Sequence, residues 1–309
     1  MTILLNGTDV RRLLDLDRCL AALRDGFLAP ASGVSPLRMR TDLPGPGTAT
    51  ALLPGLVDGV PAYTVKVNAK FPGASPALRG VVCLHDLATG ELLALLDSAT
   101  VTAYRTGLAA ALGTHALARP GASTVAVIGA GAQSELVLHG LRRLRPVTEL
   151  LVADLDRERA EAFARRHGGS AVTEIGAADI VVVATWAWEP VLHEVAPGTH
   201  VTSLGADEPG KAELAPALLG RARTFVDDLD LAVEMGALGN AGLTREHAAG
   251  TIGAVLAGSA GRRDGSEVTV YAPVGLPWQD LALSWAAYET AHQATDRQPP
   301  TGLRFDFLG

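Results

Sequence analysis

A glycine-rich turn between two apolar segments restricts the fold of this chain more than any other feature. Residues 125–128 (VAVI) form an apolar run, and residues 129–134 (GAGAQS) follow it. Apolar residues then recur at helical spacing from Leu136 to Leu141. This order predicts a buried strand, a tight turn and a helix start, the arrangement that places a dinucleotide pyrophosphate on helix N-terminal amides.

Within this turn, Gly129 allows the sharp bend, and Gly131 lets the backbone approach a phosphate without a Cβ in the way. Ser134 stands at the third glycine position of the fingerprint. A second predicted strand ends at Asp154, where a carboxylate would meet the ribose hydroxyls of the cofactor. The alternative is an ordinary strand-to-helix turn, but the alternation of strands and helices that follows favours nucleotide binding.

Length and composition exclude several classes of protein. The 309 residues suggest about two domains, and a net charge of −7 without a basic cluster argues against nucleic acid as a partner. Two cysteines, no basic-then-apolar leader and no apolar stretch of membrane-spanning length predict a cytoplasmic protein with no membrane contact.

Lysine is rare in this chain. Only Lys66, Lys70 and Lys211 are lysines among 26 basic residues. A compact ammonium can lose its proton when it is buried, whereas a guanidinium cannot, so these positions are candidates for chemistry. The alternative is that all three lysines are ordinary surface residues.

The periodicity predicts an α/β fold class: a Rossmann dinucleotide-binding domain plus an α+β domain built from the N-terminal part and the C-terminal helix. Helices are expected over 9–28, 99–117 and 277–294, with an antiparallel meander between the first two. The α/β pattern covers 123–272. We expect residues 1–112 with 280–309 to form the substrate domain and 113–279 the NAD-binding domain. The strands are expected near 48–53, 62–67, 80–85, 92–96, 124–128, 148–154, 179–184, 199–204, 223–226 and 267–271.

Charged residues near predicted strand ends are the candidates for catalysis, because ligands of a parallel sheet lie beyond the carboxyl ends of its strands. Asp207 and Lys211 follow one such strand, and Thr185 closes another. Asp207 is either a catalytic acid or a cap for a helix that begins near Ala212. Thr185 either lines the same crevice or is an ordinary strand-terminal hydroxyl.

Three further cations are candidates for ligand binding, whereas the histidines are not. Lys66 in a strand, Arg105 early in a helix and Arg38 in a loop could together grip a carboxylate, although each alone is typical of a solvated charge. The eight histidines are dispersed singly with no ligand partner nearby, so the sequence predicts no metal site. They are His85, His115, His139, His167, His193, His200, His247 and His292.

Four segments in order carry a resemblance to a known family. They are residues 102–110 (TAYRTGLAA), 128–133 (IGAGAQ), 205–214 (GADEPGKAEL) and 267–276 (EVTVYAPVGL), the last followed by Gln279-Asp280-Leu281. With these motifs the chain resembles the ornithine cyclodeaminase/mu-crystallin family over nearly its whole length. The resemblance implies a homodimer that carries a nicotinamide cofactor on a Rossmann domain.

The resemblance also implies roles for individual residues. Arg38, Lys66 and Arg105 match positions that hold the substrate α-carboxylate, and Lys66 and Asp207 are the expected catalytic residues. Asp154 favours NAD, with NADP less expected because a carboxylate repels its extra phosphate; Arg157, three residues on, is a cation that works against this preference. The expected cofactor contacts are Arg105, Thr106, Gly129, Gly131, Ala132, Gln133, Asp154, Thr185, Leu204, Lys211 and Val274.

Departures from the family pattern bear on the substrate. Ornithine cyclodeaminases have a glutamate that helps bind the distal amine, but residues 50–54 (TALLP) lack a carboxylate. Pro273 and Gly80 also differ from common family residues. We therefore expect an NAD(H)-dependent oxidoreductase acting on the Cα–N bond of a small amino acid or its imine. The alternatives are an ornithine or lysine cyclodeaminase and a mu-crystallin-like binding protein, although mu-crystallin lacks the acid at Asp207.

Overall fold

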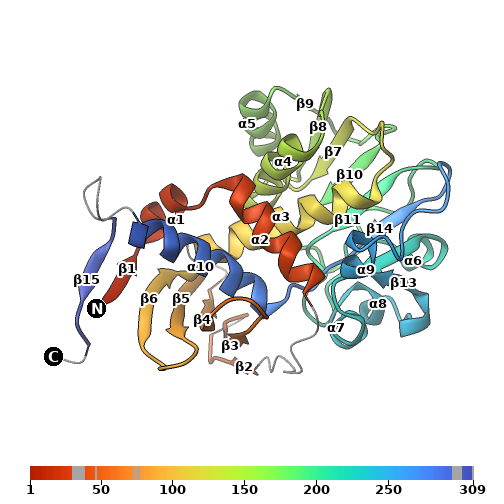
Figure 1. The fold of residues 1–309 in the computed structure, drawn as a ribbon. Helices are drawn as coiled ribbons and strands as arrows, with labels where there is room; N and C mark the ends of the chain where they lie inside the picture. The colour runs from red at the N-terminus through yellow and green to blue at the C-terminus, as the bar shows by residue number, and fades with distance from the viewer. Residues whose placement is uncertain (30–38, 46, 72–73, 75–76, 294–300, 308–309) are drawn as a thin grey trace. The chain divides into compact units, whose positions relative to one another are not determined.

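A computed structural model describes residues 1–29, 39–45, 47–71, 74, 77–293 and 301–307. The chain divides into two compact units, each with a sheet of its own. The first unit consists of Met1–Thr106 with Leu276–Gly309, and the second consists of Gly107–Gly275. Figure 1 labels the helices and strands of both units.

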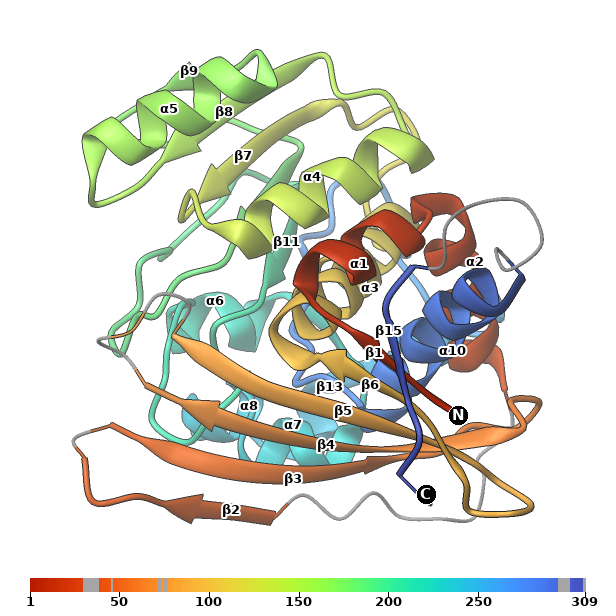
Figure 2. The ribbon, with the colours of Figure 1, turned by 90° about the vertical axis from the view of Figure 1, so that its left-hand side faces the viewer.

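The first unit has a seven-stranded sheet with the strand order β15-β1-β6-β5-β4-β3-β2. Strands β2 to β6 pair antiparallel, as the predicted meander requires, and they run side by side in Figure 2. Strand β1 pairs parallel with β6 and antiparallel with β15. The strands are β1 (Thr2–Leu5), β2 (Met39–Asp42), β3 (Ala49–Gly55), β4 (Ala62–Lys70), β5 (Leu78–Asp86), β6 (Leu92–Asp97) and β15 (Leu303–Phe305).

Helix α10 (Pro277–Gln293) brings the C-terminal part of the chain onto this sheet. It contacts β3, β4 and β5, and it also packs against α2 (Leu16–Leu28), the second of two N-terminal helices after α1 (Gly7–Leu13). Gly26 on α2 faces the Trp278 ring so closely that a Cβ there would overlap the indole. The Phe27 and Trp278 rings meet edge to face with centroids 4.9 Å apart. This packing fixes the position of α10 over the sheet.

The second unit has an eight-stranded sheet in the order β13-β12-β14-β11-β10-β7-β8-β9, and all of its pairings are parallel. The chain leaves β7 in one direction toward β8 and returns to β10 on the other side, so the strand order reverses between β7 and β10. This is the doubly wound arrangement that the sequence predicts. The strands are β7 (Thr124–Ile128), β8 (Glu149–Ala153), β9 (Ser170–Ala171), β10 (Ile180–Val183), β11 (His200–Ser203), β12 (Arg223–Val226), β13 (Ala248–Thr251) and β14 (Thr269–Tyr271).

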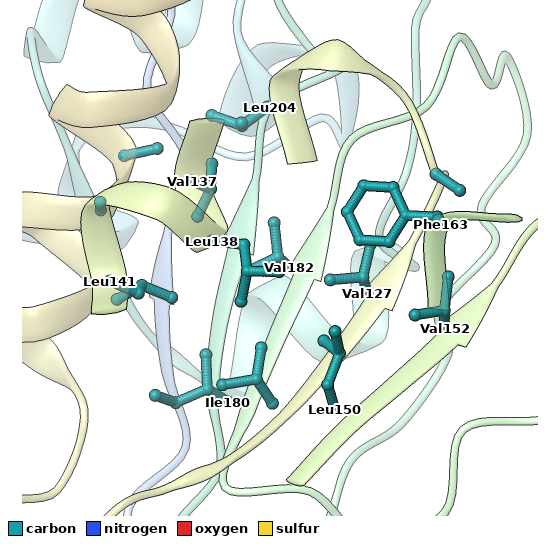
Figure 3. Packing of buried hydrophobic residues seen from close by; sticks show 14 of the residues in the cluster. Val127, Val137, Leu138, Leu141, Leu150, Val152, Phe163, Ile180, Val182 and Leu204 are labelled. Carbon is teal, nitrogen blue, oxygen red and sulfur yellow. The ribbon is translucent and has the colours of Figure 1, made fainter. Parts of the chain in front are cut away.

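A buried apolar cluster holds helices α4 (Ala132–Leu144) and α5 (Arg157–His167) against this sheet. Figure 3 shows Leu138 and Leu141 of α4 and Phe163 of α5 directed at strand residues such as Val127 and Val182. The remaining helical segments are α3 (Ser98–Leu117), α6 (Pro216–Arg221), α7 (Leu229–Glu234), α8 (Ala237–Asn240), the 3-10 turn Arg245–His247 and α9 (Ile252–Leu256). Burial of the apolar side chains in this cluster supplies the main driving force for folding of the second unit.

Five short strands lie outside the predicted elements: β1, β2, β9, β13 and β15. Each of these strands has two to four residues, too few to display a period of two. None of the described helices combines the length and the apolar character needed to cross a bilayer.

Candidate functional site

In the first unit, two predicted substrate residues converge on one carboxylate. Lys66 on β4 donates from Nζ to Asp280 Oδ2 of α10 at 2.6 Å, and Arg105 Nε lies 3.5 Å from Asp280 Oδ1. Arg105 also donates to Gln279 Oε1 at 3.2 Å, and Lys66 donates to Thr102 Oγ1 at 3.4 Å. The Lys66 and Asp280 side chains are 2% and 1% exposed, and that of Arg105 is 13% exposed. These three groups therefore carry a net charge of +1 in a largely buried place.

The third predicted carboxylate ligand, Arg38, lies outside the described residues. Thr106 is half-buried on α3, directly after Arg105. Of the three lysines, Lys66 and Lys211 are buried, at 1% and 5% exposure. The alternative that these two lysines are ordinary surface residues is therefore wrong. A lysine is almost never fully buried unless its charge is paired.

In the second unit, the glycine turn has the predicted tight geometry. Gly129 has φ of +94°, and a Cβ there would collide with the carbonyl oxygen of Ala184. The Ser134 hydroxyl donates to the Gly129 carbonyl at 2.5 Å, which explains the serine at the third glycine position. Asp154 Oδ2 accepts from the Ala130 amide at 2.7 Å and so fixes the turn from the end of β8.

Helix α4, which follows this turn, has no side-chain cap at its N-terminal end. Gly131 is the N-cap of α4 and provides no side-chain cap, and a Cβ at Gly131 would meet nothing within 4 Å. Gln133 Oε1 is buried without a hydrogen-bond partner among the described residues. The uncapped helix amides beside open space can donate to a dinucleotide phosphate, and the Gln133 oxygen can accept from a hydroxyl of the groups attached to it. These residues of the turn can therefore accommodate a dinucleotide cofactor.

Glu213 joins the ends of two neighbouring strands. Its Oε1 accepts from the Thr185 amide at 2.6 Å and hydroxyl at 2.8 Å, and its Oε2 accepts from the Ser203 hydroxyl and the Gly205 amide, both at 2.7 Å. Burial raises the pKa of Glu213, and these four hydrogen bonds oppose that shift. The Thr185 hydroxyl is thus bound to Glu213, and the carboxylate fixes the backbone that follows β10 and β11.

Asp207 and Lys211 form an ion pair within one loop. Lys211 Nζ lies 2.8 Å from Asp207 Oδ1 and 3.8 Å from Glu208 Oε1, with the Trp186 ring centroid 5.3 Å away. The Asp207 side chain is 38% exposed and that of Lys211 only 7%. The alternative role for Asp207 as a helix cap near Ala212 is wrong, because the next helix begins at Pro216. Lys211 therefore orients a carboxylate that still reaches solvent.

Two other predicted cofactor residues contribute backbone and packing. Leu204 is 9% exposed and belongs to the apolar cluster between α4 and the sheet. Val274 donates its amide to Asp227 Oδ1 at 3.0 Å, and Gly275 donates to Asp227 Oδ2 at 2.6 Å. Burial raises the pKa of Asp227, while these amides oppose the shift. Asp227 thus fixes the backbone just after β14.

The surroundings of Asp154 bear on the choice between NAD and NADP. Its side chain is 7% exposed, and Oδ1 lies 3.7 Å from Arg159 Nη1. Arg157, the cation noted from the sequence, instead pairs with Glu161 at 3.0 Å. Sequence reasoning missed Arg159, although its spacing five residues after Asp154 places it on the first turn of α5.

The prediction that each histidine stands apart from ligand partners is wrong for two of them. The ligand atoms of His139, His167 and Glu135 all lie within 4.8 Å of one another. Glu135 and His139 are four residues apart and therefore share a face of α4. His167 ends α5, far away in sequence, so the spacing of histidines alone did not reveal the cluster.

Asp280, Glu213 and Asp227 were also missed as site residues. Asp280 shares its helix face with the apolar residues Pro277 and Leu283, each three positions away. A single acid on an apolar helix face signals a buried ion pair. Glu213 and Asp227 lie in loops, where acids are common, and the sequence offers no such signal for them.

Comparison with known proteins identifies the relatives of this fold. The family model described as the ornithine cyclodeaminase/mu-crystallin family matches residues 2–295. An archaeal alanine dehydrogenase, a dimer with bound NAD, superposes with a TM-score of 0.91 at 28% identity, covering 99% of both chains. The Thermococcus litoralis Δ1-pyrroline-2-carboxylate reductase, with NADH and L-proline, gives 0.89 at 25% identity, covering 98% of this chain and 100% of that one.

A third relative represents a different reaction. The L-lysine cyclodeaminase of Streptomyces rapamycinicus is 35% identical over 255 residues, covering 71% of this chain and 72% of its own. The family model spans almost the whole sequence, including both units and the motifs quoted above. The chain belongs to the ornithine cyclodeaminase/mu-crystallin family.

Proposed function

We propose that this protein is an NAD(H)-dependent oxidoreductase that interconverts a small α-amino acid and its imine. The observation that carries the proposal is the convergence of the Lys66 ammonium and the Arg105 guanidinium beside Asp280 in a largely buried place. Two cations held close together in this way can bind a substrate carboxylate. The uncapped glycine turn of the second unit supports the cofactor, and the alanine dehydrogenase and pyrroline-carboxylate reductase relatives support the reaction class.

The residues divide the work of the reaction. Arg105 and Lys66 hold the carboxylate and thereby orient Cα. Asp207, oriented by Lys211 at 2.8 Å, takes the proton that the amine loses as the Cα–N bond becomes C=N, and it returns this proton in reduction. A nicotinamide cofactor bound at the glycine turn would supply the hydride chemistry, as the acceptor for Cα–H in oxidation and the donor in reduction. Lys66 in addition polarises the substrate through its carboxylate.

We further propose that NAD is preferred over NADP. The Asp154 carboxylate sits at the end of β8 and is fixed by the Ala130 amide, where a negative charge opposes a ribose phosphate. In Asp154→Asn the acceptor remains but the charge is lost. We expect wild type to bind NADH more tightly than NADPH, and this difference to shrink in the variant. Equal affinity of wild type for both would contradict the assignment.

The structure of β3 supports a substrate without a distal amine. Residues 50–54 lie within β3 (Ala49–Gly55) and carry no acid. A buried distal ammonium would lack its carboxylate partner there, at a cost of about 2–4 kcal/mol.

The second candidate, lysine or ornithine cyclodeamination, is favoured by the 35% identity to the lysine cyclodeaminase.

A cofactor-absorbance screen in both directions tests the function. Amino acids are supplied with NAD and cyclic imines with NADH, while ammonia is measured in parallel. Net formation or consumption of NADH supports the oxidoreductase. Ammonia release with catalytic NAD and no net NADH would establish the lyase instead, and tight ligand binding without turnover would indicate a binding protein.

Variants then test the residue roles. Lys66→Met and Asp207→Asn should each lower kcat by a factor of about 10²–10⁴ while NADH binding persists. Lys70→Met, four residues further along β4, and the exposed Asp230→Asn are the matched controls and should keep full turnover. Full activity in Lys66→Met or Asp207→Asn would reject the role assigned to that residue.

We also propose that the protein is a homodimer, as the archaeal alanine dehydrogenase relative is. Light scattering of the purified protein should give the mass of two chains. A monomer mass at concentrations used for assays would refute the proposal.

A further inference from the structure

We propose that Glu135, His139 and His167 form a binding site for a divalent transition-metal ion of the zinc type. The three ligand atoms lie within 4.8 Å of one another in the second unit. Glu135 and His139 are one turn apart on α4, and His167 is the last residue of α5. The proposal does not depend on the oxidoreductase function, since none of these residues has a role in it.

The spacing of the ligand atoms is close to that of a coordinated ion. Two atoms bound to one zinc at about 2.1 Å in a tetrahedron lie about 3.4 Å apart. His167 Nε2 and Glu135 Oε1 are 3.4 Å apart in the structure. The His139 and His167 rings face each other edge to face, with centroids 5.4 Å apart. The His139 and Glu135 side chains are half-buried, so both have room to adjust around an ion.

His167 supplies an independent indication of a ligand. The residue is only 9% exposed, and its Nε2 has no hydrogen-bond partner among the described residues. Nearly all buried polar atoms have such a partner, whereas this imidazole nitrogen has only the 3.4 Å contact with Glu135 and can therefore act as a metal ligand. Its backbone is held in place, because Arg142 Nη2 donates to the His167 carbonyl at 2.5 Å. The Phe163 ring, with its centroid 4.5 Å away, further limits ring motion.

The donor set selects the class of ion. Two imidazoles and one carboxylate suit Zn²⁺, Co²⁺ or Ni²⁺, whereas Mg²⁺ and Ca²⁺ prefer oxygen ligands alone. Three protein ligands leave a fourth position for water. A competing cation is present, since Arg166 Nη2 lies 3.8 Å from Glu135 Oε2. The positive charge of Arg166 repels an incoming cation, so Arg166→Gln should bind the ion more tightly.

Titration of the tag-free, chelator-treated full chain with Co²⁺ tests the site. We expect one equivalent to bind with visible absorption bands of a low-coordinate ion, and Zn²⁺ to displace it. Glu135→Gln, His139→Asn and His167→Asn should each weaken binding at least about tenfold, the loss seen for mere outer-shell partners. His193→Asn, an exposed histidine outside the cluster, is the matched control and should bind like wild type.

A thermal measurement keeps the test valid if a buried variant fails to fold. His139 is half-buried, so His139→Asn should fold, and Zn²⁺ should raise the Tm of wild type but not of this variant. Absence of saturable Co²⁺ binding to wild type would overturn the proposal. Equal loss of binding in His193→Asn, or a Zn²⁺-induced Tm rise that persists in His139→Asn, would overturn it as well.

Discussion

The buried ion pair between Lys66 and Asp280 allows a quantitative test of the first unit. At 2.6 Å and an effective dielectric constant of about 20, two unit charges attract by about 6 kcal/mol. Desolvation of the two ions offsets most of this energy, so the pair as a whole contributes little. Removal of one partner is different, because it leaves an uncompensated charge in a site that is 2% exposed.

The perturbation is Asp280→Asn, which keeps the shape of the side chain and removes its charge. We expect a loss of about 4 kcal/mol in the free energy of unfolding, within the 3–5 kcal/mol typical of a broken buried pair. Lys66→Met should cost less, about 2 kcal/mol, because Arg105 at 3.5 Å still compensates Asp280. The double variant should cost about 3 kcal/mol, which gives a coupling energy of about 3 kcal/mol.

Urea unfolding followed by tryptophan fluorescence is the assay. The four tryptophans are Trp186, Trp188, Trp278 and Trp285. The first two belong to the second unit and are 60% and 61% exposed, whereas the other two lie on α10 beside Asp280. A background with Trp186→Phe and Trp188→Phe therefore restricts the signal to the unit that contains the ion pair.

The control lies on the same helix. Glu289 of α10 forms an exposed ion pair with Arg18 at 3.4 Å, and Glu289→Gln should change stability by less than about 1 kcal/mol. If Asp280→Asn costs no more than this control, or if the two single losses simply add in the double variant, the assignment of a coupled buried pair is refuted.

Three further predictions concern the second unit. Gly129→Ala should destabilise by about 1–3 kcal/mol and abolish NADH binding, because the added Cβ meets the Ala184 carbonyl; fluorescence titration with NADH checks this. Glu213→Gln turns an NH₂ group toward a backbone N–H and should cost about 3 kcal/mol in urea unfolding, with a weaker affinity for NADH. Amides and Arg119 hold the pKa of Asp179 below its usual value of 3.8, so its stabilisation is complete above that pH and is lost as pH falls through the lower, folded-state pKa. The melting temperature of Asp179→Asn should consequently fall less steeply than that of wild type in this acid range.

The long elements of the fold were predictable because their periodicity is strong. The helices expected over 99–117 and 277–294 are observed as α3 (Ser98–Leu117) and α10 (Pro277–Gln293). The central parallel strands β7 (TVAVI) and β10 (IVVV) are almost wholly apolar, as strands buried on both faces require. The added edge strands β1 and β15 were not predictable, because their pairing depends on backbone groups that meet only after the chain has folded.

The site shows the same division between local and tertiary information. The glycine turn is local, and Ser134 stabilises it within six residues of Gly129. The partnership of Lys66 with Asp280 joins residues 214 positions apart, and that of His139 with His167 joins two helices. The sequence indicates that Lys66 is unusual in an arginine-rich chain, but only the fold shows that its carboxylate partner is Asp280.

Three buried carboxylates have two different structural roles in this protein. Glu213, Asp227 and Asp280 are 0%, 7% and 1% exposed. Glu213 and Asp227 accept backbone amides at the ends of strands, which caps open backbone that no neighbouring strand satisfies. Asp280 instead accepts a hydrogen bond from the Lys66 ammonium, so its loss removes a partner from a charged side chain rather than from a backbone amide. Variants of the first two should therefore loosen local backbone, whereas variants of Asp280 should alter the electrostatic potential at Lys66 and Arg105.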